Sequence, residues 1–169
     1  VMVKRLSLVA LIALAACAPA ADETQVPAGP PALEVAWRLG GLANPESVAM
    51  SGDGTFLYVT NVNGEGAEKD GNGFISRVSI TGEMLQREFA TGLDAPKGIM
   101  VGGDALYVAD IDQLVVLDAA TGAIRRRVPA PGAQFLNDLT FAPDGNVLIA
   151  DSGSARIYAI RSDTMEVWL

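Results

Sequence analysis

Histidine is absent from the 169-residue chain, cysteine occurs once, and aromatic residues make up only 6%. The lack of histidine excludes Ser-His and Cys-His nucleophile arrangements and any histidine-ligated zinc site. The single cysteine excludes an intrachain disulfide and a multi-cysteine metal cluster. An apolar run of 11 residues, Leu6 to Ala16, falls short of the about 20 residues that a membrane-spanning helix needs.

Basic residues are also scarce, with Lys+Arg 12 against Asp+Glu 20 and a net charge of −8. Nucleic-acid binding depends on neutralising phosphates, so we expect no nucleic-acid partner. The one basic run, Arg125 to Arg127, is expected on an outermost strand, where charge discourages edge-to-edge pairing.

The N-terminus has the features of an export signal. Lys4 and Arg5 precede the apolar run, which predicts that residues 1–16 are a removable signal peptide. Leu14-Ala15-Ala16-Cys17 resembles the bacterial lipobox, which implies a lipid anchor on Cys17 and a lipoprotein of the cell envelope. Ala18 after the cysteine implies the periplasmic face of the outer membrane. The alternative is an ordinary signal peptide followed by an unrelated cysteine.

A tether is expected next, over residues 17–32. Residues 18–32 hold four of the nine prolines and five alanines, without helical or strand periodicity. Chains rich in proline are semi-extended, so this segment would hold a domain away from the membrane. The folded region is then a single domain, residues 33–169.

The sequence of this domain contains an internal repeat. Three apolar stretches each end just before a short polar residue, and these residues are Asn61, Asp110 and Asp151. They are separated by 49 and 41 residues, and the longer interval contains a loop of Gly and acidic residues between Asn61 and Gly73. Tight-turn sequences precede each stretch, and each unit reads as four short strands.

Four strands in a period of about 40 residues predict an all-β fold, a β-propeller of four-stranded blades. A β-sandwich is the alternative, but it does not require a turn motif at a fixed period. We expect three blades, over residues 42–90, 91–133 and 134–169. Closed propellers have about 4–8 blades. Three blades cannot close a ring, so we expect the N-terminal half of a larger propeller, which the remaining blades or a second half-propeller would close.

Several motifs resemble the senescence marker protein/gluconolactonase family: Pro45-Glu46-Ser47, Ala95-Pro96-Lys97-Gly98, Tyr107-Val108-Ala109-Asp110, Phe135-Leu136-Asn137-Asp138 and Ile157-Tyr158 with Val167-Trp168-Leu169. The resemblance implies a six-bladed propeller and, in the complete protein, a hydrolase of lactones or esters that uses one divalent metal ion (Ca, Mg or Zn). Tyr58-Val59-Thr60-Asn61 also spells the repeat of YVTN-type propellers. The alternative function is therefore a non-catalytic YVTN/NHL-like propeller that binds a small ligand or protein at its rim.

Aligning the first strands of the three units places Glu46, Lys97 and Asn137 at one structural position, with Asp138 adjacent to Asn137. Oxygen ligands at such a position suit a hard cation. The resemblance implies Glu46 as a metal ligand and Asn137 as a contact to a small-molecule substrate. Lys97 and Asp138 are further candidates for binding substrate. No base is identified, and the family's other metal ligands lie in later blades, so the 169-residue piece is expected to be inactive alone.

Glu68 to Ile75 imitates the first eight positions of an EF-hand loop. Position twelve is Ser79 instead of Glu, and Phe74 to Ile80 reads as a strand. We expect a surface turn here, or a loop that covers the mouth of the central channel.

Overall fold

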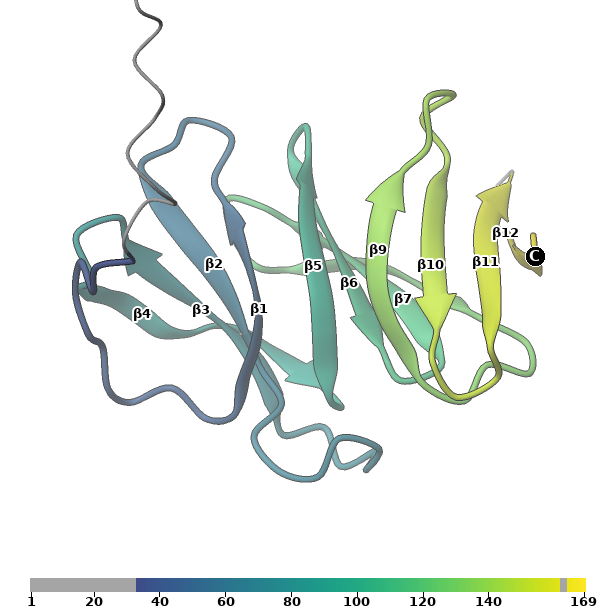
Figure 1. The fold of residues 1–169 in the computed structure, drawn as a ribbon, viewed down its shortest axis with the longest axis horizontal. Coiled ribbons are helices and arrows are strands. Elements are labelled where there is room, and N and C mark those ends of the chain that lie inside the picture. Colours follow the sequence, from purple (N-terminus) through teal and green to yellow (C-terminus); the bar gives the residue numbers. More distant parts are fainter. Residues whose placement is uncertain (1–32, 162–163) are drawn as a thin grey trace, which may run out of the picture. The chain divides into compact units, whose positions relative to one another are not determined.

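The computed structural model describes residues 33–161 and 164–169. The predicted signal peptide 1–16, the lipidation site Cys17 and nearly all of the tether 17–32 lie outside these residues. Within the described residues, twelve strands and no membrane-spanning helix are present. The all-β fold class is therefore confirmed (Figure 1).

Three antiparallel sheets are each built from four strands consecutive in sequence. The first contains β1 (Pro45–Met50), β2 (Phe56–Asn61), β3 (Gly73–Ser79) and β4 (Met84–Leu93). The second contains β5 (Pro96–Gly102), β6 (Ala105–Asp110), β7 (Gln113–Asp118) and β8 (Ile124–Pro129). The third contains β9 (Leu136–Phe141), β10 (Val147–Asp151), β11 (Arg156–Arg161) and β12 (Thr164–Val167).

Equivalent turns join the first two strands of each sheet. Gly54, Gly103 and Gly145 adopt positive φ angles of 72°, 61° and 84°, which glycine reaches without a Cβ clash. Short polar side chains fix the turns. In the first, for example, Asp53 accepts hydrogen bonds from the hydroxyl groups of Ser51 and Thr55. The tight-turn sequences recognised in the chain thus determine where each hairpin bends.

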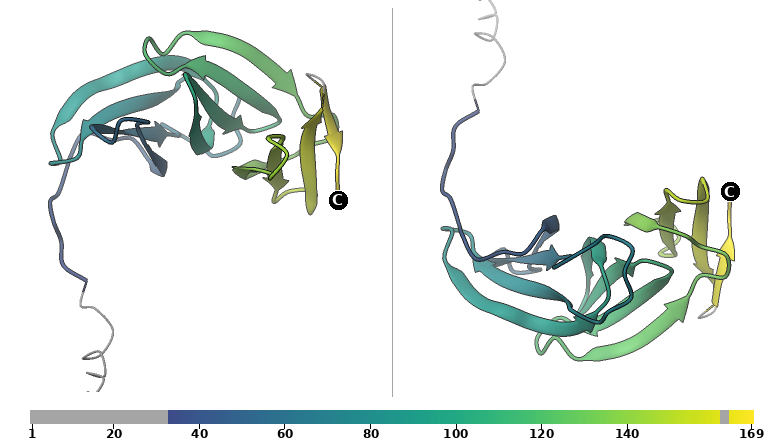
Figure 2. Two further views of the ribbon diagram at one scale, coloured as in Figure 1. Left: turned by 90° about the horizontal axis from the view of Figure 1, so that it is seen from above. Right: turned by 90° about the horizontal axis from the view of Figure 1, so that it is seen from below.

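The three sheets follow one another in chain order (Figure 2). Apolar side chains of neighbouring sheets pack together in shared clusters. β5 contacts both β1 and β9, so the first strands of the three sheets are neighbours. Tyr58 and Ile75 of the first sheet pack with Leu106 of the second. Leu114 of the second sheet belongs to the same cluster as Tyr158 of the third. Each sheet thus buries an apolar face against the next one, as propeller blades do.

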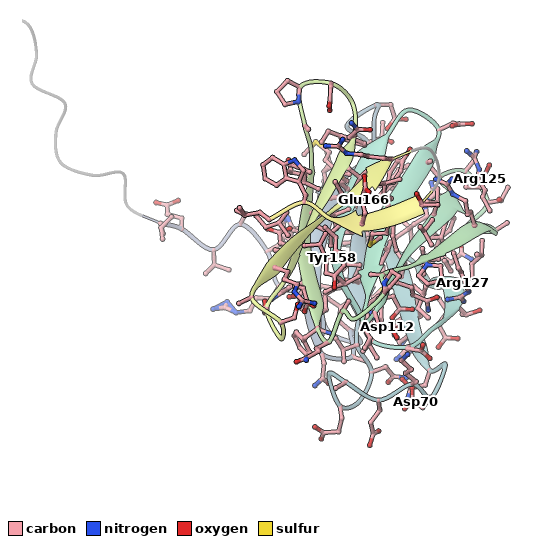
Figure 3. All side chains as sticks on the ribbon, turned by 90° about the vertical axis from the view of Figure 1, so that its right-hand side faces the viewer. Asp70, Asp112, Arg125, Arg127, Tyr158 and Glu166 are labelled. Carbon is pink, nitrogen blue, oxygen red and sulfur yellow. The ribbon has the colours of Figure 1, made fainter. Side chains whose placement is uncertain are left out.

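β8 is the outermost strand of the second sheet and carries the basic run, as predicted. Arg125 forms ion pairs with Asp104 and Asp118 at 2.8 and 2.6 Å. Arg127 donates to the carbonyl oxygen of Gly92. Figure 3 shows Arg125 and Arg127 on this strand. These two arginines are bonded within the protein, consistent with a structural role for the run.

Candidate functional site

A polar cavity of about 340 Å³ lies where the first strands of the three sheets begin. Its lining comes from all three sheets: Glu46, Ser47, Gly98, Asn137, Asp138, Ala150 and Ser152. The cavity therefore brings together three of the four predicted site residues, Glu46, Asn137 and Asp138. Ser152 was not among the candidates, although it directly follows the repeated polar position Asp151.

Strand register explains this convergence. Val48 pairs with Val59, Ile99 with Val108 and Leu139 with Ile149, so these pairs are equivalent in the three sheets. Counting back two residues along each first strand places Glu46, Lys97 and Asn137 at one position. The alignment of the repeats made from the sequence therefore agrees with the register.

The polar residue that ends each second strand holds the start of the first strand in place. We call Asn61, Asp110 and Asp151 the blade caps. Oδ1 of Asn61 accepts the backbone N–H of Ala43. The other two blade caps accept pairs of backbone N–H groups, Asp110 from residues 94 and 95 and Asp151 from residues 134 and 135.

Glu46 and Asp138 give the cavity its negative charge. Partial burial raises the pKa of the Glu46 carboxyl, the charge of Lys97 lowers it, and the charge of Asp138 raises it, with a net upward shift. Oδ1 of Asp138 accepts the backbone N–H of Leu139 at 2.9 Å. Nδ2 of Asn137 donates to Oγ of Ser152 at 3.3 Å. The side chains of Asn137 and Asp138 are thus oriented by bonds inside the third sheet.

Lys97 differs from the expectation that it faces the cavity. Its residue is 3% exposed, and it is not part of the cavity lining. Nζ donates to the carbonyl oxygens of Gly66 and Ala95 at 2.7 and 3.0 Å and lies 4.1 Å from the centre of the Phe135 ring. Burial lowers the pKa of the Lys97 ammonium, and the charges of Asp110 and Glu46 partly offset this. Lys97 therefore acts on the cavity through its charge.

The loop between β2 and β3, residues 62–72, reaches from the first sheet to the other two. Gly66 accepts the Lys97 bond, and a Cβ placed on Gly66 would lie 3.7 Å from the Phe135 ring. Lys69 forms an ion pair with Asp112, and Asp94 accepts the backbone N–H of Gly71. In Figure 1 this loop lies at the end of the sheets where β2 finishes. The segment is flanked by β2 and β3 and not by the helices of an EF-hand.

No group of three or more acidic or cysteine side chains that could hold a metal ion is present in residues 33–161 and 164–169. The donors at the cavity are carboxylate, amide and hydroxyl oxygens, which suit Ca²⁺ or Mg²⁺ better than a softer metal. Glu46, Asp138 and Asn137 can therefore contribute to a cation site, but further ligands would have to come from elsewhere.

Comparisons with known proteins find structures that share this fold. The chain matches no family model and no curated protein sequence. Among solved structures, hydrazine synthase of Kuenenia stuttgartiensis is 22% identical with a TM-score of 0.54, over 77% of this chain and 36% of that one. Virginiamycin B lyase of Staphylococcus aureus is 20% identical with a TM-score of 0.54, over 73% and 40%. A gluconolactonase of Xanthomonas campestris is 24% identical with a TM-score of 0.53, over 67% and 36%.

These similarities are distant and describe the fold. The three sheets match part of each of these β-propellers. The chain spans less than half the length of the chains that it matches.

Proposed function

From this partial propeller, we propose that the complete protein is a cell-envelope lipoprotein with a gluconolactonase-like propeller that hydrolyses lactones or esters with the help of a divalent cation. The observation that carries the proposal is the cavity shared by Glu46, Asn137 and Asp138 at the meeting point of three sheets. Similarity to a gluconolactonase is in keeping with it. The lipid anchor would be Cys17, at the periplasmic face of the outer membrane.

Each residue has a defined role in this proposal. Glu46 would bind the cation through its carboxylate, and Asn137 would bind the substrate through its amide. Asp138, held through Leu139 N–H, would accept hydrogen bonds from substrate hydroxyl groups. When bound, a divalent cation would polarise the ester carbonyl and lower the pKa of a water molecule.

Activity is assigned to the complete protein because the described residues supply only part of a metal site. Further blades, or a second half-propeller, would provide the remaining ligands and the general base. Burial raises the pKa of the Glu46 carboxyl, and the charge of Lys97 offsets only part of this rise. A bound cation would favour the ionised carboxylate further.

The proposal is tested with the complete gene product and with Glu46→Gln, which keeps the shape of the side chain and removes its charge. Calorimetric titration with Ca²⁺, Mg²⁺ and Zn²⁺ is expected to show binding that the variant weakens at least tenfold, together with slower lactone hydrolysis. Glu83→Gln, at an exposed residue between β3 and β4, is the control. Unchanged metal affinity and hydrolysis in Glu46→Gln would overturn the proposal.

A non-catalytic propeller that binds a small ligand or a protein at its rim is the second candidate. The observation that favours it is the buried Lys97, whose positive charge lies near Glu46 and opposes a second cation there. In this case the complete protein binds no divalent cation. Calorimetric titration with metal ions then shows no binding heat for either the parent or the Glu46→Gln variant.

The anchor has a test of its own. Cys17→Ser is expected to move the protein from the membrane fraction to the soluble fraction of the envelope and to abolish labelling by radioactive palmitate. Retention of label in the variant would exclude lipidation of Cys17.

A further inference from the structure

A second cavity, of about 410 Å³, lies between the first and second sheets. It is lined by the turn after β1, by side chains of β2 and β3, and by turns of the second sheet. Glu46 lies at the beginning of β1, whereas this cavity adjoins the turn at its end. It is therefore separate from the candidate site, and its lining lies entirely within the first two sheets.

Arg77 is the unusual residue of this cavity. It pairs with Tyr58 across β2 and β3, and the equivalent pairs in the other sheets are Tyr107 with Val116 and Leu148 with Ala159. The position of Arg77 is thus occupied by a small apolar residue in the other two sheets. The fold does not require a cation at this position.

The guanidinium of Arg77 lies against two aromatic rings. Its Cζ lies 3.9 Å from the centre of the Phe56 ring and 5.1 Å from that of Phe89. Nε of Arg77 is buried and has no hydrogen-bond partner. It is the one such side-chain nitrogen or oxygen among the residues that the structure describes. A buried N–H without an acceptor is unfavourable, so this end of the Arg77 side chain is not fully satisfied by the protein. Arg77 also lines the cavity, where a ligand can approach the guanidinium.

Carboxylates line the same cavity, those of Asp53, Asp104 and Asp118. They are fixed by bonds within their own sheets, because Asp53 accepts from Thr55 and Arg125 bridges the other two. With Arg77 and Arg125 against three carboxylates, the formal charge around the cavity is −1. A simple anion is therefore repelled, although Arg77 offers it a donor.

The positive charge of Arg77 and the negative charges of Asp53 and Asp118 all act on the Tyr58 phenol. Burial raises its pKa, the charge of Arg77 lowers it, and the charges of Asp53 and Asp118 raise it, with a net upward shift. The Tyr58 hydroxyl is itself occupied as a donor to the carbonyl of Ala119. The cavity thus presents a cation and carboxylates around one buried hydroxyl.

We infer that this cavity binds a small zwitterion, a molecule with a carboxylate and an ammonium group. The carboxylate pairs with the guanidinium of Arg77, and the ammonium lies toward Asp53 and Asp118. A zwitterion carries no net charge and satisfies both kinds of lining group, which neither a simple anion nor a simple amine does. This site is independent of the proposed hydrolase activity.

Calorimetric titration of the complete protein tests the inference. The probes are glycine, β-alanine and γ-aminobutyrate, which differ in the separation of their charges, with acetate and ethylamine as single-charge controls. At least one zwitterion is expected to bind ten times more tightly than either control. Equal affinity for acetate, equal affinity for ethylamine, or no binding of any zwitterion would overturn the inference.

Variants locate the site. Arg77→Val introduces the residue that the second sheet carries at the equivalent position, and it is expected to weaken zwitterion binding at least tenfold. Arg77→Met, which keeps an apolar stem beside Phe56, should do the same if the valine variant does not fold. Arg38→Val, at an exposed arginine, is the matched control. Unchanged affinity in a folded Arg77 variant would refute the assignment.

Asp53→Asn separates a binding role from a structural one. Loss of the negative charge is expected to weaken zwitterion binding and to strengthen the weak binding of acetate. A purely structural effect would weaken both, and this result would contradict a direct role for Asp53. Neither Arg77 nor Asp53 belongs to the Glu46 cavity, so lactone hydrolysis serves as an unchanged reference activity.

Discussion

Asp110 holds Ala95 in place: Oδ1 of the buried aspartate accepts the backbone N–H of Ala95 at 2.8 Å. The same carboxylate accepts the N–H of Asp94. Because Pro96 and Lys97 follow directly, this contact fixes where β5 begins. The other blade caps, Asn61 and Asp151, repeat the arrangement, so each sheet positions its own contribution to the candidate site.

Asp110→Ala is expected to lower the free energy of unfolding by about 2–4 kcal/mol, because the buried N–H of Ala95 and the partly buried N–H of Asp94 lose their acceptor. Asp110→Asn is expected to cost less, since Asn61 already serves as a cap in the first sheet. Urea denaturation followed by circular dichroism measures both. Equal losses for the two variants would show that the charge, and not the acceptor oxygen, matters at this position.

The lowered pKa of Asp151 predicts that the protein loses stability in acid. Burial raises the pKa of its carboxyl, but hydrogen bonds from Ser154, Gln134, Phe135 and Gly153 outweigh burial, and the net shift is downward. A carboxyl with a lowered folded pKa stabilises the fold above its unfolded pKa of about 3.9. This contribution is lost as the pH falls through the folded value. The urea midpoint of the parent should fall more steeply below pH 4 than that of Asp151→Asn.

Asp110 provides the opposite case. Burial raises the pKa of this carboxyl despite the hydrogen bonds that it accepts. Its stabilising contribution is therefore complete below the unfolded pKa and is lost as the pH rises through the folded pKa. Asp110→Asn should remove a decrease in stability that the parent shows above about pH 4. Identical pH profiles for the Asp110 and Asp151 variants would contradict the two opposite shifts.

Lys97→Met is expected to release the loop of residues 62–72, since Nζ then no longer donates to Gly66. A hydrogen bond from a charged donor is worth about 1.5–3 kcal/mol, so opening of the loop should become at least about tenfold more frequent. Tryptic cleavage after Lys69, which lies in this loop, reports the opening directly. Arg38→Met controls for the loss of a positive charge, and an equal cleavage rate in both variants would argue against the anchor.

Gly98→Ala is expected to disturb the candidate site. A Cβ at this position would lie 2.5 Å from the carbonyl oxygen of Asn137 and 3.0 Å from Cα of Asp138. Overpacking of this kind costs about 1–3 kcal/mol, and relief requires β9 to move away from β5. Thermal denaturation measures the loss, and metal titration of the complete protein measures the effect on the site. Gly40→Ala, which meets no atom within 4 Å, should leave both unchanged.

The fold could be predicted from sequence because its signals are local and recur. Each apolar stretch ends at a blade cap, and each hairpin bends at a glycine turn, so one unit serves as a template for the next. The same periodicity aligned Glu46 with Asn137. Their proximity therefore followed from the repeat, whereas their roles in binding metal and substrate stay predictions.

Features that depend on contacts between repeats could not be predicted in this way. Lys97 occupies the aligned position, yet its surroundings are set by Gly66 of the preceding sheet and Phe135 of the following one. The sequence contains no motif that distinguishes Arg77 from other polar residues. Its significance appears only when the register shows Val116 and Ala159 at the equivalent positions.

The position of Gly66 beside Phe135 has a consequence for biosynthesis. A ribosome releases the chain from its N-terminus, so the first hairpins emerge before Phe135 has been translated. The segment that connects β2 to β3 cannot complete its contacts until Phe135, about 70 residues later in the chain, is also available. The earliest sheet to be made is thus completed late, by a residue of the third.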